Sequence, residues 1–149
     1  MLYPDYEQPH IILNVGSSDS VDILKSGFCD GIPFTFMNAR SGEEAIGICA
    51  VNQLVRLVLL RPELSGINGF ETAAKIRETD LGIAIVMIAV NLSMSALRLA
   101  TLVGCNEIIR QPVSSSELNA LCKRYFKGLD SGVQEWGKDS LVKNQIHNI

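Results

Sequence analysis

The feature that most constrains the fold is a pair of nearly continuous apolar segments, Val55–Leu60 and Ile83–Val90. An apolar run without polar alternation is typical of a strand that is buried on both faces of a parallel sheet. Parallel strands need a crossover connection, which usually contains a helix. The two segments therefore predict an α/β chain in which strands alternate with helices.

The rest of the chain continues this alternation. Three more strands are predicted at His10–Val15, Phe34–Ala39 and Glu107–Ile109. A short helix is predicted after the first strand, with Val21, Leu24 and Phe28 on one face. Four further helical patterns cover residues 42–52, 70–78, 92–103 and 115–125. Five strand-helix units fit a flavodoxin-like, doubly wound parallel sheet with strand order 2-1-3-4-5 and helices on both faces.

Length and composition indicate one soluble domain. The 149 residues are 47% hydrophobic and 19% charged, which suits a compact globule. We expect the domain at residues 10–126, a leader at 1–9 and a tail or linker at 127–149. The longest apolar run, at residues 81–92, contains Gly82 and Asn91 and is too short to span a bilayer.

Charge and cysteine spacing exclude several classes of partner and site. The net charge is −3 and the basic residues are scattered, which argues against nucleic acid as a partner. The four cysteines contain no C-x-x-C pair, so neither a zinc site nor a redox motif is predicted. Reduced, mostly buried thiols are typical of a cytoplasmic protein.

Ligands of an open parallel sheet bind beyond the carboxyl ends of the strands, where the strand order reverses. The residues to examine therefore follow the first, third, fourth and fifth strands. They are Gly16, Ser17, Ser18, Asp19, Arg61, Pro62, Glu63, Ala89, Val90, Arg110, Gln111 and Pro112.

From about His10 to Phe126 the chain resembles the receiver domains of two-component response regulators. The most specific segment is Leu59–Glu71, which resembles a buried strand, the phosphoacceptor Asp and a Met-Pro-Gly-x-Asp-Gly loop. Ser41–Ala45 resembles the start of the family's second helix, and Val103–Val113 resembles the region around its Lys-Pro pair. The resemblance implies a CheY-like fold, a cis Gln111–Pro112 peptide bond and a role in phosphorelay signal transduction.

The residues that carry the family's chemistry are all replaced. The resemblance aligns the two magnesium-binding acids with Gly16 and Ser17, the phosphoacceptor with Arg61, the Ser or Thr with Ala89, the Lys with Gln111 and the aromatic switch residue with Ile108. Mg²⁺ needs carboxylate oxygens, and a guanidinium is no nucleophile at neutral pH. We therefore predict a pseudo-receiver that is neither phosphorylated nor an enzyme and that holds no metal or cofactor.

Arg61 and Asp19 each keep two interpretations. The Arg61 cation either fills the space of Mg²⁺ and phosphoryl group and pairs with Asp19 or Glu63, or it is a drifted residue whose side chain reaches solvent. Asp19 is either that displaced acid or the N-cap of the first helix.

The leading functional hypothesis is protein–protein interaction through Ser93–Val103 and Glu107–Tyr125, the face that receivers use for dimer and output contacts. The expected partner is another signalling protein (a histidine kinase, a regulator or an output protein) or a second copy of the chain, and not a membrane. Two alternatives stay open, namely phosphorylation at a displaced acid and a ligand- or redox-sensing pseudo-receiver. Charged candidates for the interface are Arg98, Glu107, Arg110, Glu117, Lys123 and Arg124.

Overall fold

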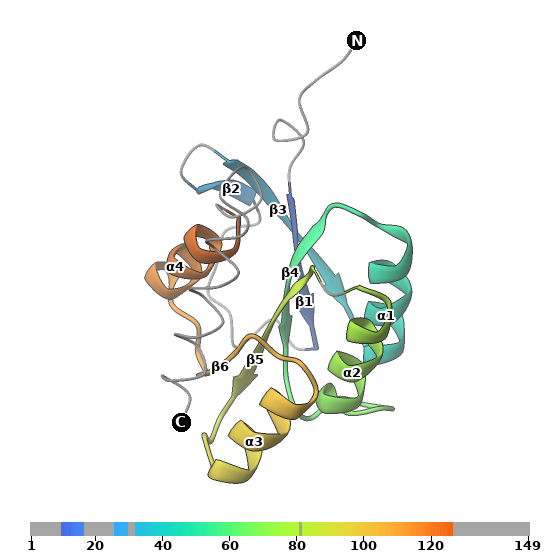
Figure 1. Cartoon of the computed structure of the whole chain (residues 1–149). Helices are drawn as coiled ribbons and strands as arrows, with labels where there is room; N and C mark the ends of the chain where they lie inside the picture. The colour runs from blue at the N-terminus through green and yellow to red at the C-terminus, as the bar shows by residue number, and fades with distance from the viewer. Residues whose placement is uncertain (1–9, 17–25, 30–31, 81, 127–149) are drawn as a thin grey trace.

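A computed structural model describes residues 10–16, 26–29, 32–80 and 82–126, so the predicted leader and tail lie outside the described residues. Five strands run parallel in the order β3-β1-β4-β5-β6, which is the predicted order 2-1-3-4-5 (Figure 1). These strands are β1 His10–Val15, β3 Ile32–Ala39, β4 Val55–Leu60, β5 Ala84–Ala89 and β6 Glu107–Arg110.

A sixth strand, β2 (Ser26–Cys29), lies antiparallel to β3 at the edge of the sheet. The prediction of a helix that includes Phe28 is therefore wrong, because Phe28 pairs with Pro33 in the ladder. The remainder of that predicted helix lies outside the described residues. The sequence carries an alternative signal here, since Asp-Gly between two short apolar stretches favours a hairpin. Helical spacing over so few residues is a weaker signal than this dipeptide.

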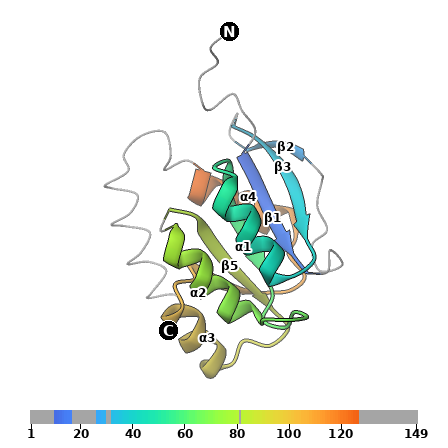
Figure 2. The ribbon, with the colours of Figure 1, turned by 90° about the vertical axis from the view of Figure 1, so that its right-hand side faces the viewer.

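Four helices among the described residues cover the two faces of the sheet. They are α1 Gly42–Val51, α2 Gly69–Thr79, α3 Met94–Leu102 and α4 Ser115–Phe126. Helices α1, α2 and α3 contribute buried residues to one core, and α4 contributes to a second core on the opposite face. Figure 2 shows α1 and α2 in front of the strands and α4 behind them. Within the described part of the chain, no helix has the length and hydrophobicity needed to cross a bilayer.

The central strands are buried on both faces, as their apolar sequences predict. In β4, Val58 and Leu60 belong to the core under α1–α3, whereas Leu57 and Leu59 belong to the core under α4. All four residues have no exposed surface. Side chains of a strand alternate between its two faces, so a strand that is apolar throughout needs cover on both.

Side chains of the first turns fix where two helices begin. Ser41 caps α1 by accepting from the Glu44 backbone N–H at 3.1 Å. Asn68 and Glu71 form a complete capping box at the start of α2, in which each side chain accepts from the other residue's backbone N–H. This capping box fixes the end of the loop that follows β4, where the candidate site lies.

Arg77 of α2 ties that helix to the amino ends of β5 and β6. Its guanidinium donates to the carbonyl oxygens of Gly104 (3.0 and 2.9 Å), Asp80 (3.1 Å) and Ile83 (2.6 Å), and to Oδ1 of Asn106 (2.9 Å). Burial lowers the pKa of Arg77, with smaller opposing effects from Cys105 and Asp80. The network holds the edge of the sheet that is remote from the candidate site.

Candidate functional site

The site lies at the carboxyl ends of β1 and β4, on either side of the point where strand order reverses. Arg61 directly follows β4, and only 7% of its surface is exposed. Its Nη1 donates to Oδ1 of Asn14 at 3.0 Å and to the Val15 carbonyl oxygen at 2.8 Å. The alternative in which the Arg61 side chain reaches solvent is therefore wrong. The guanidinium turns toward β1 because main-chain and amide oxygens are available there.

Asn14 extends this contact to a third strand. Its Nδ2 donates to Oδ1 of Asn38 on β3 at 3.1 Å, and 2% of its surface is exposed. A guanidinium can only donate, so the amide oxygen of Asn14 must face Arg61 and its nitrogen must face Asn38. Arg61, Asn14 and Asn38 thus form a polar row across β4, β1 and β3. Asn14 was not among the predicted site residues, although a polar residue inside an apolar strand is a signal visible in the sequence.

Gly16 provides the room that the Arg61 side chain occupies. Its φ is +101°, and a Cβ built there would lie 3.0 Å from Cδ2 of Leu64 and 3.4 Å from Cδ of Arg61. A Cβ at this position, which the resemblance aligns with a receiver's first acidic residue, would therefore crowd Leu64 and would lie in ordinary contact with Arg61. Any side chain at position 16 would also be strained by the backbone conformation.

The two proposed charge partners of Arg61 have different outcomes. Asp19, like Ser17, lies outside the described residues. Glu63 is exposed, and its carboxylate makes no hydrogen bond or ion pair with any residue that the structure describes. The structure therefore does not join Glu63 to Arg61.

The loop between β4 and α2 is held at both ends. The Gly69 N–H donates to the Pro62 carbonyl oxygen at 2.8 Å, and a Cβ on Gly69 would lie 2.0 Å from the Arg61 carbonyl oxygen. Just before the N-cap of α2, the Ile67 N–H donates to the carboxylate of Glu43 at 3.3 Å. The loop therefore folds back tightly on Arg61, and only glycine fits at position 69.

The remaining receiver positions lie at the same end of the sheet or behind it. Ala89 ends β5 and is 4% exposed, and Ile108 of β6 is 6% exposed. The backbone N–H of Gln111 donates to the Ala89 carbonyl oxygen at 2.9 Å. The Gln111–Pro112 peptide bond is cis, as the resemblance implied. Neither Ala89 nor Ile108 carries a polar group.

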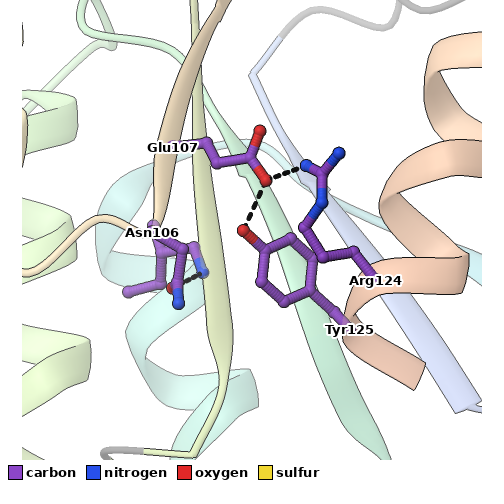
Figure 3. A network of polar contacts seen from close by, with 5 residues as sticks. Asn106, Glu107, Arg124 and Tyr125 are labelled. Carbon is purple, nitrogen blue, oxygen red and sulfur yellow. Dashed lines mark hydrogen bonds and ion pairs between the residues drawn. The ribbon is translucent and has the colours of Figure 1, made fainter. Parts of the chain in front are cut away.

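Two of the predicted interface charges are paired within the chain. Figure 3 shows the Glu107 carboxylate of β6 accepting hydrogen bonds from Arg124 and from the Tyr125 hydroxyl, both on α4. Burial lowers the pKa of Arg124, but the hydrogen bonds and charges of Glu107 and Tyr125 together raise it above its usual value. This contact fastens α4 to the edge strand.

The other predicted interface residues are exposed. Arg98, Arg110 and Lys123 present cations to solvent. Glu117 accepts from the backbone N–H of Ser114 at 3.0 Å at the start of α4. The face made by α3, β6 and α4 therefore has an excess of exposed positive charge.

The described residues favour neither a metal site nor a reactive thiol. No group of three or more His, Cys, Asp or Glu side chains that could hold a metal ion occurs among them. Burial raises the pKa of Cys49 to about 11 and that of Cys105 to about 12. Both residues are free thiols whose nucleophilic thiolate form is disfavoured.

Solved structures similar to this chain include response regulators and their receiver domains. A two-component response regulator from Clostridium difficile is 22% identical with a TM-score of 0.67, and the match covers 83% of this chain and 100% of that one. A CheY-like receiver domain from Methanospirillum hungatei JF-1 is 16% identical (TM-score 0.61, 89% and 99% covered).

A third similar structure is a co-crystal of the Saccharomyces cerevisiae histidine phosphotransfer signalling protein Ypd1 with the receiver domain of its downstream response regulator Ssk1. It is 17% identical with a TM-score of 0.64, and the match covers 83% of this chain and 93% of that one. No protein-family model and no curated protein sequence matches the chain. The chain therefore has the fold of CheY-like receiver domains.

Proposed function

We propose that this chain is a receiver-like module that is not phosphorylated and that acts in two-component signalling by binding another protein. One observation carries the proposal. The residue aligned with the phosphoacceptor is Arg61, and its buried guanidinium is hydrogen-bonded to Asn14 and Val15 at the end of β1.

Phosphoryl transfer to a receiver needs an anionic oxygen nucleophile and a divalent cation. A guanidinium supplies no nucleophilic lone pair, and its fixed positive charge repels Mg²⁺. Moving Arg61 aside would leave the buried Asn14 amide oxygen without its donor. An unsatisfied buried polar group costs about 1–3 kcal/mol, so the observed arrangement resists displacement. We infer that the Arg61 cation holds the carboxyl ends of β1 and β4 in one constitutive state.

The α3-β6-α4 face supports the interaction half of the proposal. Met94, Arg98 and Leu102 lie four residues apart on α3 and form one exposed line, with Met94 54% and Leu102 81% exposed. With Glu107 paired internally, the exposed charges nearby are mainly positive. Apolar side chains rimmed by cations favour a signalling protein that presents carboxylates around an apolar patch over a second copy of this face.

Two measurements test the proposal. Incubation with acetyl phosphate or beryllofluoride and Mg²⁺ should leave the intact mass and the Mg²⁺-dependent spectrum unchanged, whereas an aspartyl-phosphate adduct would overturn it. For the interaction, Leu102→Glu should abolish capture of a signalling partner. Val51→Glu is the matched control, because Val51 is 83% exposed but lies on α1. Equal losses with both variants would contradict the assignment of the face.

A further inference from the structure

A cavity of about 480 Å³ opens between the β4–α2 loop and α3, at the carboxyl ends of β4 and β5. Small-molecule sites have volumes of roughly 300–1,000 Å³, and open α/β sheets bind ligands at this edge. The residues that line the cavity come from the β4–α2 loop, the start of α2, the end of β5, the β5–α3 loop and α3. They are Pro62, Glu63, Phe70, Ala89, Val90, Asn91, Ser93, Ser95, Ala96 and Leu99.

The walls of the cavity expose apolar surface to water. Phe70 and Ala96 are half-buried, Leu99 is 40% exposed and Val90 is 60% exposed. Covering apolar surface of this kind is favourable, because it removes that surface from water. The walls therefore suit the hydrocarbon or aromatic part of a ligand.

Three polar side chains around these walls are uncommitted. Glu63, Asn91 and Ser95 make no side-chain hydrogen bond to any residue in the described ranges. The Ser93 hydroxyl, in contrast, accepts from the Ala96 N–H at 3.1 Å and caps α3. Apolar walls with a few free polar groups are the usual composition of a ligand site.

Charge decides the class of ligand. Glu63 is the single charged residue among those that line the cavity. The amino end of α3 opposes it with a partial positive charge, but this amounts to about half an elementary charge. The Arg61 guanidinium points across to Asn14 and Val15, not into this cavity. The net preference is therefore for a cation.

We propose that this cavity binds a small organic cation, an ammonium or amidinium group carried on an apolar body. The cationic group pairs with the Glu63 carboxylate and donates to Asn91 or Ser95, while the apolar body packs on Phe70 and Leu99. This inference goes beyond the proposed function and does not depend on it. The proposed function rests on the Arg61 guanidinium, and Arg61 is not among the residues that line the cavity.

The test compares two probes of similar size and opposite charge, 2-phenylethylammonium and 3-phenylpropionate. Each is titrated into the full chain to about 10 mM, above the millimolar dissociation constant typical of a fragment-sized ligand, while ¹H–¹⁵N spectra are recorded. We expect the ammonium probe to give saturable shifts at Ala89, Ser93 and Ser95. The carboxylate probe should give much weaker ones.

Variants link the binding to the cavity. Glu63→Gln should weaken binding of the ammonium probe about fivefold, the effect of losing one exposed charge-assisted contact. Glu78→Gln removes an exposed carboxylate from the far end of α2 and should have no effect. Ser95→Trp should block the cavity without touching the core. Absence of saturable shifts, equal binding of both probes, or equal effects of the two Gln variants would each overturn the proposal.

Discussion

Replacing Arg77 tests whether its hydrogen bonds stabilise the end of the sheet that is remote from the candidate site. We predict that Arg77→Met lowers the free energy of unfolding by about 3 kcal/mol. Methionine keeps a long apolar side chain and removes the guanidinium, so the change isolates the hydrogen-bonding network from the packing of α2 against the sheet.

The magnitude follows from the acceptors. Three main-chain carbonyls, those of Asp80, Ile83 and Gly104, lose the donor that Arg77 supplies. Asn106 Oδ1 loses one donor but keeps the Ile85 N–H at 2.8 Å. A net contribution of about 1 kcal/mol for each of the three carbonyls gives the expected loss. The hydrogen bonds of Arg77 have a larger gross energy than this net value. Burying the charged guanidinium costs desolvation energy, which also lowers the pKa of Arg77. Methionine avoids that desolvation cost, so the net loss is smaller than the gross energy.

Urea unfolding followed by circular dichroism measures the change. Arg98→Met is the matched control, because Arg98 is exposed on α3 and makes no hydrogen bond or ion pair with a described residue. It should cost less than about 0.5 kcal/mol. Arg77→Lys should recover less than half of the loss, since an ammonium cannot reach all the acceptors in one plane. A small loss for Arg77→Met, or full recovery by lysine, would refute this account of the network.

Three other changes have defined outcomes. Gly69→Ala puts a Cβ 2.0 Å from the Arg61 carbonyl oxygen and should cost about 2 kcal/mol or more in thermal unfolding, whereas Gly47→Ala on open helix surface should stabilise slightly. Arg61→Asp should bind no beryllofluoride with Mg²⁺ by ¹⁹F NMR, because position 16 still lacks an acid; binding would contradict the importance of Gly16. Burial raises the pKa of Cys49 from 9.0 to about 11, so the unfolded thiol ionises first. Stability in urea should then fall as pH rises from 9.0 towards 11, less steeply in Cys49→Ala, and an identical pH profile would show that burial has no such effect.

The sequence predicted the parallel sheet because the signal for its central strands lies within each strand segment. Ile83–Val90 is apolar throughout and Val55–Leu60 is apolar except for Arg56, and a strand covered on both faces suits that pattern. The edge strand β2 was missed because a segment as short as Ser26–Cys29 has no periodicity that distinguishes strand from helix.

The direction of the Arg61 side chain could not be predicted for a different reason. It depends on the space that Gly16 leaves and on the oxygens of Asn14 and Val15, which are more than forty positions away along the chain. The sequence also offered Glu107 and Arg124 as separate interface charges. Only the packing of α4 on β6 brings them together.

The contact between Arg61 and Gly16 bears on how such a chain could evolve. An acid placed at position 16 would crowd Leu64 in a backbone conformation that side chains rarely adopt. An acid placed at position 61 would leave the Asn14 oxygen without its donor. Each of these two substitutions alone therefore carries a structural cost. Because both positions contact the Arg61 side chain or replace it, we expect the effect of a change at position 16 to depend on the residue at position 61, which is epistasis between the two positions.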